Sequence, residues 1–188
     1  MNAPLNIALI YGSTRRGRFC DTVVRWAAAA LERDAQLQLQ LIDPVAFAMP
    51  LDDAGSAPGL KQALQRADGF IVVTPEYNHG YPAPLKALID AFSEPWHAKP
   101  VAFVAYGGVS GGLRAVEQLR QVFAEVHAMT IRDCVSFASA SEQFDRDGVL
   151  QSAERATRTM ARMLLQLKWW ASVLRDARSM QPYSALLL

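Results

Sequence analysis

Three glycine-containing loops hold most of the residues that could bind a ligand. The first runs from Gly12 to Arg18 (GSTRRGR), the second from Thr74 to Pro82 (TPEYNHGYP) and the third from Tyr106 to Gly112 (YGGVSGG). Hydroxyls, arginines and backbone N–H groups bind phosphate, whereas a rigid loop with Tyr and Asn suits a flat polar ligand. The loops therefore predict a site for a flat, phosphorylated molecule.

The first loop combines phosphate-binding features in a short turn before a helix. Its glycines permit positive φ, its hydroxyls can cap the helix, and its three arginines add charged donors. An ordinary capped turn with solvated arginines is the alternative. The spacing Gly12-x4-Gly17 imitates a nucleoside triphosphatase loop, but Arg18 and Phe19 replace the required Lys and Ser/Thr. The dinucleotide pattern GxGxxG is absent as well.

The second and third loops each have an alternative reading. Tyr77 and Asn78 could contact a flat ligand, or the second loop could be a turn whose rings pack on the next helix. The third loop contains the hydrolase pattern GxSxG around Ser110, which requires a downstream acid and histidine. The sole downstream histidine, His127, falls at the far end of the following helix, roughly 20 Å or more away at about 1.5 Å per residue. We therefore reject a hydrolase.

The remaining reactive side chains do not form a recognisable site. His79, His97 and His127 lack metal-ligand spacing. Cys20 and Cys134 are far apart in sequence, which argues against a disulfide or zinc site and fits a reducing compartment. Cys20 falls in the first turn of a predicted helix, so it is either a thiol of lowered pKa or a small buried residue.

These loops connect strands and helices that alternate along the chain. Short apolar or β-branched runs predict strands at 5–11, 37–41, 69–74, 101–106 and 130–137. Helical spacing of apolar residues predicts helices at 19–32, 60–66, 84–92, 113–126 and 150–178. A long connection joins residues 43–59. This order predicts an α/β fold with a doubly wound parallel sheet, in which ligands bind beyond the carboxyl ends of the strands.

Composition limits the classes of protein. The chain has 188 residues, a net charge of +1 and a 51% hydrophobic content, which predicts one folded domain over residues 1–188. The near-zero charge gives no reason to expect a nucleic-acid or membrane partner. We see no signal peptide and no apolar run long enough to span a membrane, so we expect a cytoplasmic protein.

Taken together, the loops resemble the NADPH-dependent FMN reductase family, which has a flavodoxin-like fold and includes quinone, azo and chromate reductases. The matching pieces are Gly12-Ser13-x-Arg15, the second loop with Leu85-Lys86, and the glycine-rich third loop. The resemblance covers about residues 5–137. It implies a five-stranded flavodoxin-like sheet and a single FMN-binding domain with a C-terminal helix near 150–178 and a short tail.

The resemblance also implies where FMN binds. Ser13 and Arg15 would hold the phosphate, the second loop would run along the isoalloxazine ring, and the third loop would meet its pyrimidine edge. Family members often carry Ser and Asn where this chain has Arg18 and Cys20. The full set of expected FMN-binding residues is Gly12, Ser13, Thr14, Arg15, Arg18, Phe19, Cys20, Pro75, Glu76, Tyr77, Asn78, Gly107, Gly108, Ser110, Gly111 and Gly112.

The implied activity is hydride transfer from NADPH or NADH to FMN, followed by electron transfer to a small-molecule acceptor. No side chain is expected to be catalytic, because the chemistry would occur on the flavin. An electron carrier without turnover is the alternative, although such carriers are usually strongly acidic; a non-catalytic scaffold is a third reading. The family's subunit contact would include Tyr77, Tyr81 and helix 84–92, which predicts a homodimer or a dimer of dimers.

Overall fold

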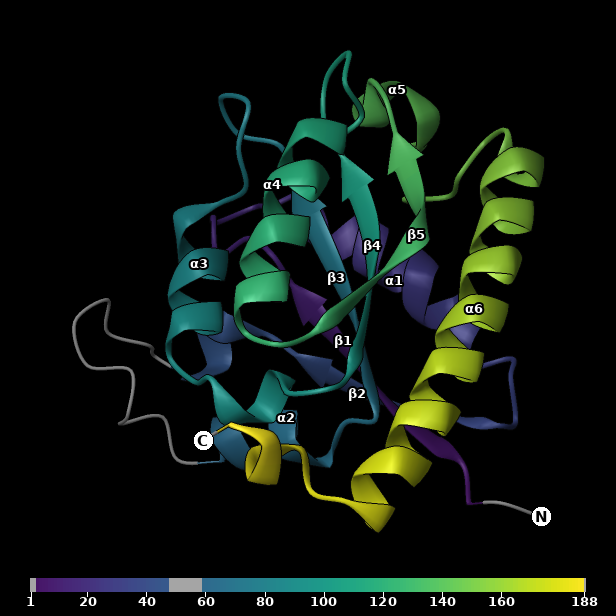
Figure 1. The fold of residues 1–188 in the computed structure, drawn as a ribbon. Coiled ribbons are helices and arrows are strands. Elements are labelled where there is room, and N and C mark those ends of the chain that lie inside the picture. Colours follow the sequence, from purple (N-terminus) through teal and green to yellow (C-terminus); the bar gives the residue numbers. More distant parts are fainter. Residues whose placement is uncertain (1–2, 48–58, 188) are drawn as a thin grey trace.

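The computed structural model describes residues 3–47 and 59–187, which form a five-stranded sheet with helices on both faces (Figure 1). The strands are β1 (Leu5–Tyr11), β2 (Leu37–Ile42), β3 (Gly69–Pro75), β4 (Pro100–Tyr106) and β5 (Met129–Phe137). The helices are α1 (Cys20–Leu31), α2 (Leu60–Arg66), α3 (Ala83–Asp90), α4 (Leu113–Glu125), α5 (Ala140–Gln143) and α6 (Ala153–Met180).

All neighbouring strands are parallel, in the order β2-β1-β3-β4-β5. This is the flavodoxin-like order, and it confirms the predicted fold class. The strand order reverses between β1 and β3. The loops that follow β1, β3 and β4 therefore emerge at one end of the sheet, the upper end in Figure 1.

Two apolar clusters hold the helices to the sheet. On one face α1 and α6 pack on side chains such as Ile71 and Val73, and on the other α2, α3 and α4 pack on side chains such as Phe70 and Val72. Adjacent residues of β3 thus contribute to opposite cores, since side chains alternate across a strand. A strand buried on both faces reads as a continuous apolar run, which is why β3 and β4 were easy to predict.

The predicted elements are confirmed with small differences in their ends. The C-terminal helix begins at Ala153 and ends at Met180, rather than covering 150–178. Helix α5 and three short 3₁₀ turns (44–47, 94–96 and 183–186) were not predicted. In the long connection 43–59, residues 48–58 lie outside the described residues. No helix of the described segments is long and apolar enough to cross a membrane.

The second core generates a stability prediction for α4. Leu119 is fully buried, whereas Leu113 on the same helix is 45% exposed. Leu119→Ala should lower the free energy of unfolding by about 2–5 kcal/mol, because it removes buried methyl groups and leaves a cavity. The matched variant Leu113→Ala should stay within about 0.5 kcal/mol of the parent protein. Urea denaturation measures both; equal losses would contradict the assigned packing of α4.

Candidate functional site

The first loop begins where β1 contacts β3. The Gly12 N–H donates to the Val73 carbonyl at 2.8 Å, and a Cβ at Gly12 would lie 2.6 Å from that oxygen. Ser13 is fully buried, and its Oγ lies 2.9 Å from the Tyr77 hydroxyl in the second loop. The N–H groups of Thr14, Arg16 and Gly17 have no acceptor within the described residues. They form a donor set suited to an anion.

Two arginines of the first loop, Arg15 and Arg18, have different surroundings. The Arg15 guanidinium lies 3.7 Å from the centre of the Tyr77 ring, and no carboxylate of the described residues pairs with it. Arg18 instead donates to the Ser13 carbonyl (2.6 Å) and forms ion pairs with Asp21 and Asp43. Arg15 is thus available to a ligand, whereas Arg18 holds the loop in place.

The Arg18–Asp43 ion pair shifts the pKa of both groups. Hydrogen bonding to Asp43 raises the pKa of Arg18 despite partial burial. Burial opposes ionisation of Asp43, but the hydrogen bond from Arg18, the Val45 N–H and the positive charge of Arg18 together outweigh burial and lower the pKa of Asp43. A phosphate would have to compete with this carboxylate for Arg18. Sequence reasoning missed Asp43, since it follows a different strand and has no motif of its own.

Phe19 and Cys20 lie behind the loop rather than at its surface. The Phe19 ring packs against Tyr106 and Phe144 at centroid distances of 5.8 and 5.6 Å. Cys20 is fully buried, and burial raises the pKa of its thiol. This decides between the two readings of Cys20: it is a packing residue, and the start of α1 does not activate it.

The second loop is a tight turn that carries two residues at positive φ, Asn78 (50°) and His79 (69°). Tyr77 and Gly80 exchange backbone hydrogen bonds of 2.9 and 3.1 Å across it. The His79 carbonyl accepts a hydrogen bond from the Gln118 amide of α4 at 2.9 Å. The side chains of Asn78 and His79 are exposed, so they are accessible to a ligand or to another subunit.

Glu76 connects the second loop to the third. Its side chain is only 6% exposed and accepts hydrogen bonds from the Ser110 hydroxyl (2.6 Å), the Arg114 N–H (3.1 Å) and the Arg114 guanidinium (2.9 Å). Burial opposes its ionisation, but these donors outweigh burial and lower the pKa of Glu76. The Glu76 carboxylate is therefore ionised near pH 7, and the positive charge of Arg114 balances it. Arg114 is a residue that the motif analysis did not single out.

The third loop depends on glycine at close backbone approaches. Gly112 has φ +86°, and a Cβ there would lie 2.7 Å from the Ala105 side chain. The Gly107 and Gly108 carbonyls accept hydrogen bonds from the chain after β5, at 3.2 and 2.9 Å. In contrast, the N–H groups of residues 108–110 have no acceptor within the described segments. These three backbone N–H groups are therefore unpaired donors at the end of β4.

The rejected hydrolase reading is also excluded by geometry. Ser110 donates to Glu76, not to a histidine. The ring of His127 lies 5.3 Å from that of His97, and its Nδ1 is 3.3 Å from the Tyr183 hydroxyl, beyond the opposite end of α4. No group of three potential metal-binding side chains occurs in the described part of the chain.

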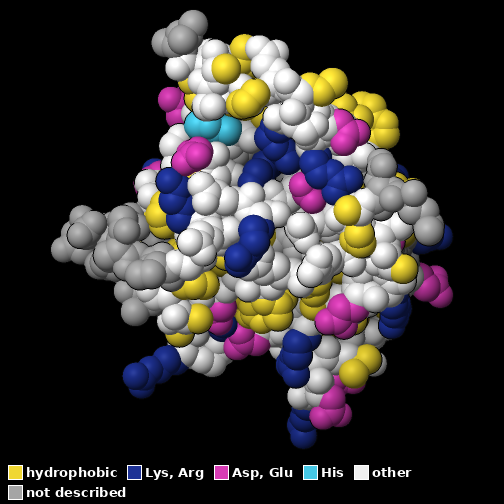
Figure 2. All heavy atoms as spheres, turned by 90° about the horizontal axis from the view of Figure 1, so that it is seen from below, with side chains coloured by type: hydrophobic (Ala, Val, Ile, Leu, Met, Phe, Trp, Pro, Cys, Tyr) yellow, Lys and Arg dark blue, Asp and Glu magenta, His cyan; other side chains and the backbone are white. Residues whose placement is uncertain are grey.

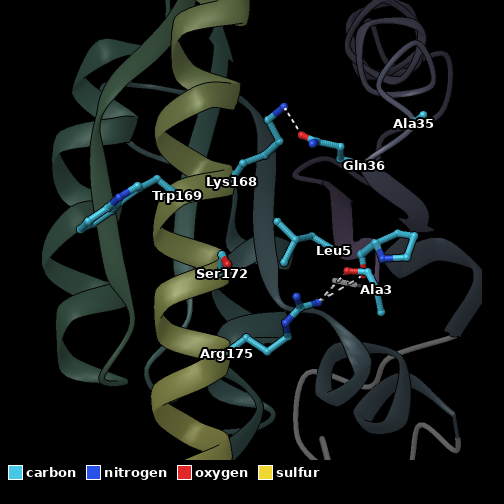
Figure 3. Close-up of a pocket in the computed structure, with 9 residues that line it drawn as sticks. Ala3, Leu5, Ala35, Gln36, Lys168, Trp169, Ser172 and Arg175 are labelled. Carbon is cyan, nitrogen blue, oxygen red and sulfur yellow. Dashed lines mark hydrogen bonds between the residues drawn. The ribbon is translucent and has the colours of Figure 1, made fainter. Parts of the chain in front are cut away.

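A small cavity of about 200 Å³ lies between the first and second loops and the start of α3. Its lining residues are Ser13, Thr14, Arg15, Tyr77, Pro82, Ala83 and Pro84. A larger cavity of about 720 Å³ lies beside α6, near the amino end of β1 (Figure 3). Its two cations, Lys168 and Arg175, already bond to Gln36 and to the Ala3 carbonyl, so the chemistry favours the smaller cavity.

The end of the molecule opposite the loops is seen in Figure 2. On that face Lys and Arg side chains alternate with Asp and Glu rather than gathering into a patch of one sign. Arg175 and Arg178, for example, lie within 3.5 and 3.7 Å of Asp68. This face therefore does not resemble a polyanion-binding surface.

Comparison with known proteins identifies the family. The sequence profile of the NADPH-dependent FMN reductase family matches residues 5–142. An NAD(P)H-dependent FMN reductase from Schizosaccharomyces pombe is 33% identical over 62% of this chain and 64% of its own length, slightly under two thirds. An NAD(P)H:quinone oxidoreductase from Solanum tuberosum is 32% identical over 85% of this chain and 90% of its own length.

Solved structures support the same fold. The flavoenzyme NAD(P)H:(acceptor) oxidoreductase from Paracoccus denitrificans superposes with a TM-score of 0.71 at 20% identity. The alignment covers 92% of this chain and 98% of that protein. The profile match and the sequence relatives agree: this chain belongs to the NADPH-dependent FMN reductase family.

Proposed function

We propose that this protein is an FMN-dependent NAD(P)H oxidoreductase that reduces a small-molecule electron acceptor. The observation that carries the proposal is the convergence of three donor-bearing loops at the reversal point of the sheet. Bound FMN would take a hydride from NADPH or NADH and pass electrons on, which supplies the chemistry that side chains cannot. The protein would act in the cytoplasm, in keeping with two cysteines that form no disulfide.

The residues present fit FMN. A single terminal phosphate matches one loop that offers unpaired N–H groups, the Ser13 and Thr14 hydroxyls and the available Arg15 guanidinium. The absence of GxGxxG removes the usual second phosphate site of a dinucleotide. Gly12, which allows the backbone to approach β3, would position these donors. Arg18, Phe19 and Cys20 would support the loop from behind.

The second and third loops fit the ring system. Asn78 can both donate and accept hydrogen bonds, and Pro75 and Tyr77 leave a rigid turn beside it. Arg114 balances the charge of Glu76, and the N–H groups of residues 108–110 have no acceptor within the described residues. Such preorganised donors would stabilise negative charge on a ring that gains electrons, as an oxyanion hole does. Gly107, Gly111 and Gly112 would give the loop its shape.

An electron carrier with no turnover of its own remains the alternative. Carriers that dock to protein partners usually rely on a strong acidic surface for steering. The net charge of this chain is +1, which favours a small acceptor instead. The two proposals differ in whether NAD(P)H itself can deliver electrons to the bound cofactor.

Arg15→Ala should weaken FMN binding by about 1.5–3 kcal/mol, the contribution of a hydrogen bond to a charged group. Fluorescence titration of the apoprotein measures this loss. Arg16→Ala is the matched control on the same loop, and we expect a smaller effect because the Arg16 side chain is outside the lining of the cavity. Unchanged affinity in Arg15→Ala, or tighter binding of FAD than of FMN, would contradict the assigned phosphate site.

The proposed reaction predicts ping-pong kinetics at one shared site. NAD(P)H alone should bleach the yellow holoprotein, and initial rates with a quinone should give parallel double-reciprocal lines. Glu76→Gln and His79→Ala should each keep activity within about tenfold, well short of the roughly 10²–10⁴-fold effect of a general acid or base. Intersecting lines would refute the shared site, and a loss of about a thousandfold in either variant would reveal a missed proton donor.

We also propose a homodimer that contacts through the second loop and α3. Tyr77 and Tyr81 are half-buried within one chain, and the exposed His79 lies between them in sequence. Aromatic residues are enriched in interface cores, and twofold pairing is the commonest oligomer symmetry. Light scattering at micromolar concentration should give a mass of at least twice 20.7 kDa. A species of 20.7 kDa alone would rule the dimer out.

A further inference from the structure

The long helix α6 carries an apolar line on the side away from the sheet. Its inner side, which includes Met163 and Leu167, is buried in the core. On the outer side Leu165, Trp169 and Val173 are 65%, 58% and 43% exposed. Residues four apart lie on one helical face, so these three form a continuous strip. Single exposed apolar residues are ordinary, but a strip that includes Trp suggests a contact surface.

The adjacent parts of the same chain do not cover this strip. In Figure 3, Lys168 and Arg175 reach toward Gln36 and Ala3, whereas Trp169 projects to the other side of the helix. Lys168 also pairs with Asp34 at 2.6 Å, so the Lys168 side of α6 is bonded to the turn between α1 and β2. Trp169 also borders the larger cavity, whereas Leu165 and Val173 are not among its lining residues.

Charges at the two ends of the strip are complementary. Arg162 lies seven residues before Trp169, and Asp176 lies seven residues after it, on the same outer face. Arg162 uses its Nε to pair with Asp133, which leaves its terminal N–H groups available. No described residue forms an ion pair with the Asp176 carboxylate. The strip therefore has one positive and one negative end about Trp169.

We propose that α6 pairs antiparallel with α6 of a second copy of this chain, about a twofold axis at Trp169. In this register Trp169 meets Trp169, Leu165 meets Val173, and Arg162 meets Asp176 of the other subunit. Exposed Ala161 and Ala177 would also face each other, and their small size allows the helices to approach closely. A parallel pairing would instead place like charges together. The pairing is isologous, as a twofold axis requires.

This surface includes none of the three loops, so the inference does not rest on the flavin chemistry. It is also distinct from the dimer contact proposed at the second loop and α3. Two different twofold interfaces on one chain generate a closed dimer of dimers. If the α3 contact does not form, the α6 contact alone still produces a dimer.

Cysteine cross-linking tests the register in the full-length holoprotein carrying Cys134→Ser. Trp169→Cys should form an intermolecular disulfide with itself about tenfold faster than Thr157→Cys, an exposed control on another face of α6, because a disulfide needs Cβ atoms about 4 Å apart. Leu165→Cys alone should cross-link slowly, but a mixture of Leu165→Cys with Val173→Cys should cross-link fast. Equal rates for Trp169→Cys and the control, or rapid self-linking of Leu165→Cys, would overturn the proposal.

Sedimentation velocity tests the contact without a cross-link. Trp169→Ala should raise the dissociation constant of the α6 contact about a hundredfold. The twofold axis places one Trp169 from each subunit in the contact, and the loss of each Trp should raise the dissociation constant about tenfold. Thr157→Ala should behave as the parent protein, and both should retain bound FMN. An unchanged association for Trp169→Ala would refute the pairing. Binding of the parent protein to anionic phosphatidylserine vesicles without self-association would instead assign the strip to a membrane surface.

Discussion

The pairing of β1 with β3 is the constraint on which the candidate site depends. Strand order reverses at this pair, and parallel sheets of this kind bind ligands beyond the carboxyl ends of their strands at such a point. Gly12 extends the pairing by one hydrogen bond to Val73, at a distance that leaves no room for a side chain. The first and second loops are consequently in contact, as the Ser13–Tyr77 hydrogen bond and the stacking of Arg15 on Tyr77 show.

A second constraint is electrostatic and joins the other two loops. A carboxylate that is 6% exposed would be costly without partners, and Glu76 receives them from Ser110 and Arg114. These interactions link the residues that follow β3 to those that follow β4, and the charge of Glu76 is balanced by that of Arg114. The N–H groups of residues 108–110, beside this pair, have no acceptor within the described residues.

Most of the fold could be predicted because its signals are local. The apolar runs of β3 and β4 and the periodic pattern of α4 follow from burial on both faces of a strand and on one face of a helix. The three loops were located for the same reason, since glycines and prolines mark them. Helix α5 was missed because four residues are too few to show a helical period.

The order of elements, the type of sheet and the donor chemistry of each loop follow from the amino-acid sequence alone. Which donors are available depends on the folded chain: Arg15 is available, whereas Arg18 is engaged by Asp43, 25 residues away in sequence. The tertiary structure likewise made Cys20 a packing residue and gave Glu76 a partner in Arg114, which is 38 residues distant. The physical reason is that periodicity reports the burial of a segment, whereas charge pairing depends on which segments the strand order brings together.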